Sequence, residues 1–483
     1  MGPDAERNEA PSRKVYFLEP YYGGSHREIA EGFAGHSRHL VTLLTMPARH
    51  WKWRLRGSAY HLGEELKRRL DGDGAELIIC STPSDVSLLR ARFGSPAAPI
   101  LLYVHEHQFS YPTSTGDTPD ANYPLTDLAS ALAADAVWFN SHWCRNAFLE
   151  GARALLGRMP DYRCRGVVDE VAATSRVVYP GVNPPGGLPE VAGVPAAGGT
   201  PAAYDVSAAG GVAAAEGVSA TDSVPAADGT PAAESVSAAE STPAAAPPAS
   251  APDPHAGGPI ILWNHRWEHD KSPRVFFEAL EILDRPGLQW RLAVVGGAGR
   301  RVPEVFEVAR TCLAHRIVQW GFIEDRAEYH RLLQRCHIVV SAARQENFGL
   351  AVLEAVRAGL HPVLPRRLSY PELYGGSDAH FYDEAGGTDH ASSADEAIGT
   401  DHTSSADDAG GKVGQSGAAP EATRLAETLE AALNDPALHC EGARSARRRW
   451  AARYDWSNRI AEWDRGIEEL IRRAGGERSD VRK

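Results

Sequence analysis

Short apolar runs alternate with stretches of helical periodicity in two separate parts of the chain. Each run is about five residues long, which is typical of strands that a parallel sheet buries on both faces. The runs lie at 15–19, 40–44, 77–80, 100–104 and 136–140 in the first part, and at 260–263, 290–295, 317–319, 338–341 and 361–364 in the second. The pattern predicts two α/β domains with doubly wound sheets, and the carboxyl ends of the strands should face a cleft between the domains.

Two segments of low complexity interrupt this pattern. Residues 185–258 are almost wholly Ala, Pro, Gly, Ser, Val and Thr, and residues 383–418 contain a near-exact acidic repeat. Neither composition can bury a core, so we expect a disordered linker and a disordered surface insertion. The remaining chain divides into a domain at 14–184 and a second domain formed by 259–382 and 419–473.

The charge of the chain is uneven. The two low-complexity segments carry −8 and −7 of the formal charge of −13, so the rest of the chain has a net charge of +2. An anionic partner such as a nucleic acid is therefore compatible with the sequence. No apolar run approaches the roughly 18 residues of a membrane span, and the six cysteines have no metal-binding spacing. We expect a cytoplasmic location, reduced thiols and no structural metal.

The segment from Gln345 to Gly359 carries two glutamates, Glu346 and Glu354, around helically spaced apolar residues. If both were helical, they would lie about 80° apart around the axis and roughly 12 Å apart along it. Glycosidases place their two carboxyls about 5 to 9.5 Å apart, so this spacing does not suit hydrolysis. It suits the two hydroxyl-rich ends of a nucleotide sugar, with the diphosphate at the helix N-terminus. The alternative is an ordinary amphipathic helix with solvated glutamates.

Other chemistry-bearing residues follow predicted strands. Gly23 and Gly24 come after the first strand, where glycine lets the backbone approach a ligand, although a tight turn would need it equally. His105, Glu106, His107 and Gln108 follow the fourth strand, where a histidine can donate to a sugar hydroxyl or exchange a proton. Zinc at this polar group is disfavoured because adjacent residues rarely point at one ion.

Two cations, Arg266 and Lys271, follow the strand at 260–263. Placed beside the end of a strand, they can neutralise a diphosphate leaving group in place of a metal ion. The alternative is that they are ordinary surface charges.

Cations alternate with tryptophans at Trp51, Lys52, Trp53 and Arg54, in what should be a loop after the second strand. Flat aromatic faces beside cationic groups suit stacking on bases and pairing with phosphates. The alternative is packing with the tryptophans turned inward. A further arginine-rich stretch at 444–453 is compatible either with a packed helix or with an RNA contact.

In their order along the chain these motifs resemble the GT-B glycosyltransferases of family 4. Five segments are similar to the tRNA-queuosine α-mannosyltransferases: Tyr22-Gly-Gly-Ser-His26, Trp51-Lys-Trp-Arg54, His105-Glu-His-Gln108, His265-Arg-Trp-Glu-His-Asp-Lys271 and Tyr370-Pro-Glu372. The resemblance implies two Rossmann-like domains, an N-terminal one on the acceptor side and a C-terminal one for the nucleotide sugar, with a final helix that crosses back. It also implies transfer of mannose from GDP-mannose to the cyclopentene-diol of queuosine in tRNA(Asp), with retention and without a metal or other cofactor.

The resemblance assigns roles to individual residues. It implies that Arg266 and Lys271 hold the diphosphate, that Glu354 binds the ribose, and that Glu346 and His105 contact the hexose. The remaining expected donor contacts are Gly23, Gly24, Phe348, Gly349, Leu350 and Glu372, and the expected acceptor or tRNA contacts are Trp51, Lys52, Trp53, Arg54, Glu106, His107 and Gln108. His107 departs from the eukaryotic pattern, which has asparagine there.

Two rival functions remain open at the level of sequence. One is a glycosyltransferase of the same fold that acts on an envelope glycan or a lipid. The other is a non-catalytic tRNA-binding protein built on the same fold.

Overall fold

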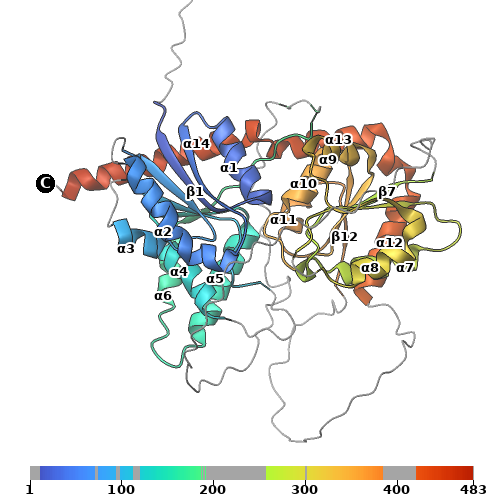
Figure 1. Cartoon of the computed structure of the whole chain (residues 1–483), viewed down its shortest axis with the longest axis horizontal. Coiled ribbons are helices and arrows are strands. Elements are labelled where there is room, and N and C mark those ends of the chain that lie inside the picture. The colour runs from blue at the N-terminus through green and yellow to red at the C-terminus, as the bar shows by residue number, and fades with distance from the viewer. Residues whose placement is uncertain are drawn as a thin grey trace, which may run out of the picture.

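The computed structural model describes residues 11–70, 74–93, 98–111, 120–186, 188, 191, 257–299, 302–384 and 420–481. The two low-complexity segments predicted at 185–258 and 383–418 lie outside these residues, apart from their ends and residues 188 and 191. The described chain forms two α/β halves, shown in blue to green and in yellow to red in Figure 1. This arrangement confirms the predicted fold class.

The first half is built on a six-stranded parallel sheet with the strand order β2-β1-β3-β4-β5-β6. Its strands are β1 (Lys14–Tyr22), β2 (Leu40–Pro47), β3 (Leu77–Ser81), β4 (Ile100–Val104), β5 (Ala136–Phe139) and β6 (Ser175–Val177). Its helices are α1 (Gly24–His36), α2 (Trp51–Leu70), α3 (Val86–Phe93), α4 (Asn122–Ala133), α5 (His142–Gly157) and α6 (Gly166–Thr174). β3 and β4 are buried along their whole length, as expected for central parallel strands.

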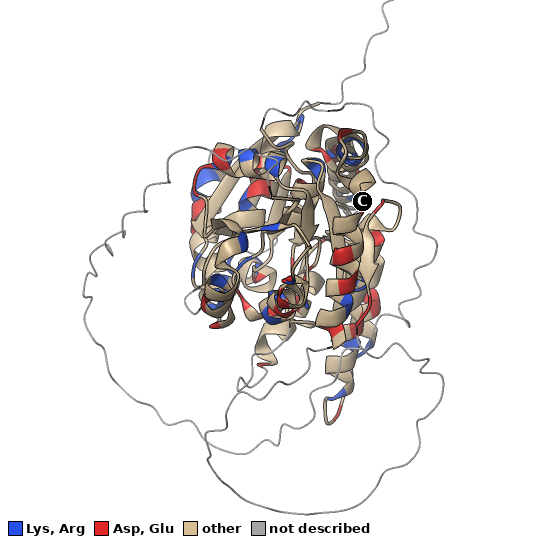
Figure 2. Ribbon diagram, turned by 90° about the vertical axis from the view of Figure 1, so that its right-hand side faces the viewer, with Lys and Arg blue, Asp and Glu red and all other residues tan. Residues whose placement is uncertain are grey.

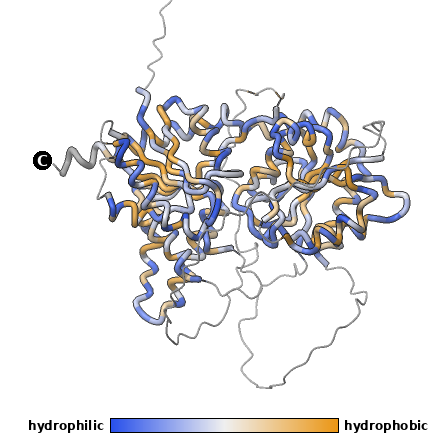
Figure 3. The backbone as a smooth tube through the Cα atoms, in the orientation of Figure 1, coloured by the Kyte–Doolittle hydropathy of each residue, from blue (hydrophilic) through white to orange (hydrophobic). Residues whose placement is uncertain are grey.

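The second half repeats this plan with the strand order β12-β11-β10-β7-β8-β9. Its strands are β7 (Ile260–Trp263), β8 (Arg291–Val294), β9 (Ile317–Trp320), β10 (Ile338–Val340), β11 (His361–Pro365) and β12 (His380–Tyr382). Its helices are α7 (Pro273–Leu283), α8 (Val305–Cys312), α9 (Arg326–Arg335), α10 (Leu350–Arg357), α11 (Tyr370–Tyr374), α12 (Pro420–Asn434) and α13 (Glu441–Ala451). The apolar residues, orange in Figure 3, gather along the strands of both sheets.

Each sheet reverses its winding at one place, and these two places position the site. In the first sheet the chain moves from β1 outward to β2 and then returns to β3 on the other side of β1. In the second it moves from β7 through β8 to β9 and returns to β10 on the other side of β7. Ligands of open α/β sheets bind at such reversals, outside the carboxyl ends of the strands.

The last helix, α14 (Trp456–Val481), returns from the second half to the first (Figure 1). Trp463 is fully buried against Phe33, Tyr103 and Trp138 of the first half. Just before α14, Asp455 accepts two hydrogen bonds from the buried guanidinium of Arg357 on α10, at 2.8 and 2.9 Å. These contacts fix the end of the chain to both halves.

One stretch differs from its sequence-based expectation, and in another the structure favours one of two alternatives. The predicted loop at Trp51–Arg54 is wrong, because helix α2 begins at Trp51. The residues from Trp51 to Arg56 include no proline, glycine or β-branched side chain, so nothing opposes a helix there. In the arginine-rich stretch, Arg444 and Arg447 are buried and donate to backbone carbonyls of Cys336 and Leu438, which favours the packed-helix alternative.

Basic and acidic residues are interspersed over the face of the second half, without a region of one sign alone (Figure 2). No helix of the described residues is both long and apolar enough to cross a membrane.

Candidate active site

A cavity of about 400 Å³ lies between the two halves. Residues of α1 and the segment after β6 line one side, and residues from the ends of β7, β8 and β9 and from helices α9 and α10 line the other. Its volume is within the range of small-molecule sites, roughly 300 to 1,000 Å³. Of the residues expected at a donor site, Gly24, Leu350 and Glu354 line this cavity.

Glu354 projects from α10 into the cavity. Its Oε1 accepts from Arg326 Nη2 at 2.6 Å and lies 3.2 Å from His330 Nε2, both on α9. Arg326 also donates to Glu28 Oε2 on α1 at 3.1 Å, so one guanidinium bridges the two halves across the cavity. The sequence alternative of a solvated glutamate on an ordinary helix does not describe Glu354, which is 8% exposed.

α10 begins in a conformation that favours glycine. Gly349 has a φ of 84°, which side chains rarely adopt, and a Cβ there would lie 3.2 Å from the ring of Tyr370. The backbone N–H of Gly349 donates to Glu346 Oε1 at 2.9 Å. Glu346 is therefore not part of the helix but precedes it and binds its N-terminus.

Lys271 is a buried cation that contacts the segment before α10. Its Nζ donates to the carbonyl of Gln345 at 2.5 Å and lies 3.1 Å from Asp270 Oδ2 and 3.4 Å from Glu346 Oε2. Burial would lower the pKa of Lys271, but the carboxylates of Glu346 and Asp270 outweigh it and raise this pKa. Burial likewise opposes ionisation of Glu346, but Lys271 lowers its pKa below the ordinary value. Both groups are therefore charged at neutral pH.

Arg266 is the second cation at the end of β7. Its side chain is 49% exposed, and its guanidinium lies 3.3 Å from Glu268 and 3.9 Å from Asp270. Asp270 thus connects both predicted diphosphate ligands. Unlike Lys271, Arg266 has the solvent access that a phosphate ligand needs.

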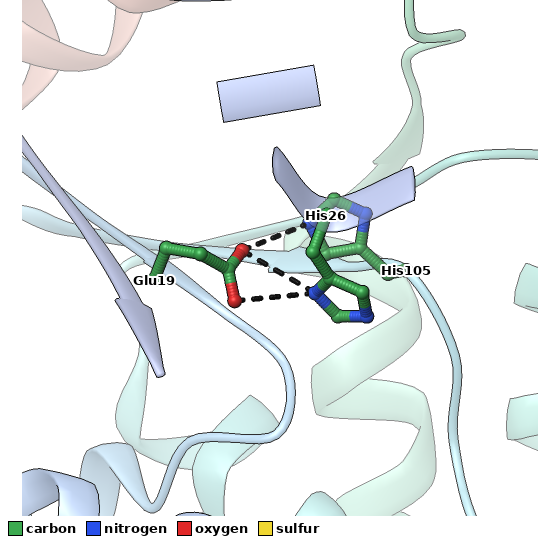
Figure 4. Close-up of side chains that lie close together, drawn as sticks. All are labelled: Glu19, His26 and His105. Carbon is green, nitrogen blue, oxygen red and sulfur yellow. Dashed lines mark hydrogen bonds and ion pairs between the residues drawn. The ribbon is translucent and has the colours of Figure 1, made fainter. Parts of the chain in front are cut away.

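A cluster of buried polar side chains lies at the carboxyl ends of β1, β3 and β4. Glu19, His26 and His105 place their ligand atoms within 4.8 Å of one another, and Figure 4 shows both imidazoles turned towards the carboxylate. Within the described part of the chain this is the one group whose side chains could contact a common metal ion. His26 is on α1 close to Gly24, so the cluster adjoins the cavity wall.

Several expected site residues lie elsewhere. Glu372 accepts from the backbone N–H groups of His142 and Trp143 at the start of α5, both at 2.8 Å, and from the hydroxyl of Tyr179. Its carboxylate therefore caps α5 and joins the two halves, and it does not line the cavity. Sequence could not reveal this role, because the helix that Glu372 caps is some 230 residues away.

His107 also does not face a ligand. Its ring is buried against Phe109 and Phe148, and burial lowers its pKa to about 3. The imidazole is part of the core, so the structure lends no support to the predicted contact of His107 with the acceptor. The neighbouring Gln108 donates its backbone N–H to Asp127 at 2.8 Å, while Glu106 is only partly buried.

The aromatic and basic residues at the start of α2 lie on the surface of the first half. Trp53 is 76% exposed. Lys52 lies over the rings of Trp51 and Tyr123, which are 5.2 Å apart. Arg54 is half-buried, and its Nε donates to the carbonyl of Pro47 at 3.4 Å. Trp53 is therefore not an inward-packed residue.

Three residues that complete the cavity had no assigned role at the level of sequence. Arg326, Phe322 and Asn264 line it, and Phe322 is 69% exposed although it is a large aromatic residue. Phe322 stands directly after Gly321, which follows β9 and has a φ of 104°. An aromatic residue after a glycine at a strand end was the available signal. Arg326 gave none, because its two partners come from distant helices.

Comparisons with known proteins agree with this geometry. The family described as tRNA-queuosine alpha-mannosyltransferase N-terminal matches residues 14–182, and the family described as glycosyl transferases group 1 matches residues 251–375. Sucrose-phosphate synthase from Thermosynechococcus elongatus has the same fold, with a TM-score of 0.58 and 15% identity over 95% of this chain and 99% of that one. The chain therefore has the fold of the GT-B glycosyltransferases, and each of its two halves matches a glycosyltransferase family model.

Within that class the resemblance is to one kind of enzyme over most of the chain. The tRNA-queuosine alpha-mannosyltransferase of Drosophila melanogaster is 27% identical over 361 residues, which cover 74% of this chain and 81% of the fly protein. A GDP-mannose:cellobiosyl-diphosphopolyprenol alpha-mannosyltransferase of Xanthomonas campestris is 31% identical over 113 residues, 23% of this chain and 29% of that protein.

Proposed function

We propose that this protein transfers mannose from GDP-mannose to the cyclopentene-diol of queuosine in tRNA(Asp), with retention of the anomeric configuration. The observation that carries the proposal is the match of the first half, residues 14–182, to the N-terminal family of tRNA-queuosine alpha-mannosyltransferases. In a two-domain transferase this half faces the acceptor. A tRNA acceptor also implies a cytoplasmic location.

The cavity between the halves suits the nucleoside of the donor. Arg326 and His330 both contact Oε1 of Glu354, so a ribose hydroxyl would donate to Oε2. Phe322 would cover one face of the base. The names of both curated relatives specify a mannosyltransferase, and that of the Xanthomonas protein specifies GDP-mannose as the donor.

The diphosphate would lie between the start of α10 and the two cations after β7. The first N–H groups of α10 and the exposed guanidinium of Arg266 would bind the phosphate oxygens. Lys271 adds a fixed positive charge behind Glu346, which orients the hexose. As the bond between the anomeric carbon and the phosphate oxygen breaks, these cations stabilise the charge that develops on GDP, so the proposal requires no metal.

Retention follows if the acceptor attacks from the face that the leaving group departs from. A queuosine hydroxyl oxygen forms the new bond to the anomeric carbon, and its proton passes to the departing phosphate. His105, at the end of β4, would contact the sugar. The step is balanced without a covalent enzyme intermediate.

The start of α2 would bind the tRNA. Trp53 offers an exposed face for stacking, and Arg49, Lys52 and Arg54 supply positive charge without an acidic neighbour between residues 49 and 63. Binding of tRNA should therefore weaken steeply as salt increases.

The test is incubation of the purified protein with GDP-mannose and tRNA that contains queuosine, followed by mass analysis of the nucleosides. A gain of one hexose on queuosine, absent with UDP-glucose and absent with tRNA that lacks queuosine, is the expected result. Transfer of hexose to a polyprenol-diphosphate acceptor, with none to tRNA, would instead support an acceptor like that of the Xanthomonas relative. Tight tRNA binding without stabilisation by any sugar nucleotide would support a non-catalytic tRNA-binding protein.

A further inference from the structure

Glu19 is a fully buried carboxylate that none of the roles above uses. Its Oε2 accepts from the hydroxyl of Ser81 at 2.5 Å, and its Oε1 accepts from the backbone N–H of Tyr21 at 2.8 Å. His26 Nδ1 lies 3.2 and 3.3 Å from the two oxygens. The Ser81 hydroxyl and the Tyr21 N–H are neutral donors, so His26 is the contacting group that can place a positive charge against this carboxylate.

His105 is the third member of this cluster and the one without a hydrogen bond at its buried nitrogen. Its Nε2 lies 3.7 Å from Glu19 Oε2 and has no hydrogen-bond partner in the part of the chain that the structure describes. Its ring is tilted by 44° against that of His26, with the centroids 4.3 Å apart, and it meets the Tyr103 ring edge to face at 4.8 Å. The imidazole is thus held by ring contacts, and its protonation depends on which histidine compensates Glu19.

The pKa values of the two histidines are shifted in opposite directions. Burial by itself would lower the pKa of His26, but the contacts with Glu19 outweigh it and raise this pKa above the ordinary value. Burial lowers the pKa of His105 far below its ordinary value, and the positive charge of His26 lowers it further. One carboxylate, one imidazolium and one neutral imidazole leave no unbalanced charge in the core.

We propose that Glu19 and His26 form a buried ion pair that positions the His105 imidazole against the transferred sugar and keeps that imidazole uncharged. The sugar contact rests on the proposed function, whereas the ion pair does not. Glu19 and His26 are positioning residues, since they act through His105. An uncharged His105 can exchange hydrogen bonds with a sugar hydroxyl without repelling the positive charge that develops at the anomeric carbon.

Other titratable groups also face this cluster. Glu106, next to His105, attracts the proton on His26, while Arg266 of the second half opposes it. Tyr21 lies 5.8 Å from the His26 ring, and Tyr103 is buried with a pKa raised well above its ordinary value, so neither phenol ionises near neutral pH. Glu19 is therefore the group whose charge decides between the two histidines.

Substitution of His26 by Asn should transfer the proton to His105. The Glu19 carboxylate would lose its cation, and the nearest remaining ring nitrogen is that of His105. The pKa of His105 should therefore rise, because its proton would then compensate the Glu19 carboxylate. The double variant Glu19→Gln/His26→Asn removes the negative charge as well, so His105 should again be neutral throughout. Ser81→Ala removes a hydrogen bond to Glu19 without changing any charge and serves as the matched control.

The measurement is the titration of histidine carbon resonances in ¹³C-labelled protein, with His105 assigned from its own Asn variant. We expect His105 to titrate in His26→Asn and not in the wild type, the double variant or Ser81→Ala. In parallel, kcat of His26→Asn should fall about tenfold for each pH unit below the new pKa of His105. In the double variant kcat should not fall in this way as the pH is lowered.

Distinct results would overturn the proposal. An unchanged His105 titration in His26→Asn would refute the ion pair. The expected titration with a kcat that is flat with pH would refute the contact of His105 with the sugar. One tightly bound zinc ion per chain, lost in His26→Asn, would show that the cluster is a metal site instead. The expected titration in a protein inactive with every sugar nucleotide would support the ion pair and refute the transfer function.

Discussion

Replacement of Lys271 by Met would test both the stability and the chemistry of the donor site. The ammonium of Lys271 is buried and lies 3.1 Å from Asp270 and 3.4 Å from Glu346. Asp270 is 1% exposed, and its carboxylate has no hydrogen-bond partner among the described residues beyond its ion pairs with Lys271 and Arg266. Removing one partner of a buried ion pair costs about 3 to 5 kcal/mol, because the other charge stays buried without compensation. At about 2 to 4 °C per kcal/mol, the melting temperature should fall by about 6 to 20 °C.

Transfer should slow for a different reason. Without the cation behind Glu346, less of the negative charge on the departing diphosphate is stabilised. Loss of one such preorganised contact typically costs about 10²- to 10³-fold in kcat. Because folded domains are stable by about 5 to 15 kcal/mol, the variant should remain folded at 20 °C, where circular dichroism can verify this before the assay.

The double variant Asp270→Asn/Lys271→Met separates the two effects. It removes the uncompensated charge together with the cation, so most of the lost melting temperature should return. The low kcat should not, because the cation is still missing. If the double variant regained both stability and kcat, Lys271 would be a structural cation only. If Lys271→Met retained kcat within about threefold, the diphosphate would lie elsewhere.

Three further predictions concern separate parts of the molecule. Glu354→Gln should raise KM for GDP-mannose about tenfold or more with a smaller effect on kcat, since a hydrogen bond to a charged group contributes about 1.5 to 3 kcal/mol. Steady-state kinetics measure both constants, and an unchanged KM would contradict ribose binding at Glu354. Trp53→Ala should weaken tRNA binding by about 1 to 3 kcal/mol in a filter-binding assay and leave the melting temperature unchanged. In the folded protein His107 has a pKa of about 3, whereas in the unfolded chain it binds a proton near pH 6.5. The free energy of unfolding should therefore fall as the pH drops from about 6.5 towards 3. In His107→Asn this decrease with falling pH should be smaller. Urea unfolding at several pH values measures this slope, and an identical slope in the variant would show that His107 is not the group responsible.

The main strands could be predicted because a parallel strand that is buried on both faces is a continuous run of apolar residues in the sequence. β3 and β4 are continuous apolar runs, and both were expected where they are found. β6 and β12 were not expected, because each is a three-residue strand at the edge of its sheet. Short edge strands bury little, so their sequences carry no comparable pattern.

The candidate site could be predicted only where its residues follow a strand or open a helix. Gly349 and Glu354 were expected near the donor from their spacing. Gly349 lies at the start of α10, and Glu354 lies on the face of α10 that lines the cavity. Glu372 was assigned to the donor from its motif, but it caps a helix of the other half. His107 was assigned to the acceptor from its place in the motif that follows β4, but its ring packs in the core against Phe109 and Phe148.

By itself the sequence determined the two α/β halves, the glycine at the start of α10, and the cations after β7, because each depends on local periodicity or on backbone conformation. Only the tertiary structure decided which charges meet. Arg326 bridges Glu28 and Glu354, and His26 rather than His105 compensates Glu19. These pairings join residues that are far apart along the chain, and their strength depends on burial, which removes the water that would otherwise screen each charge. No local pattern encodes either the distance or the loss of solvent.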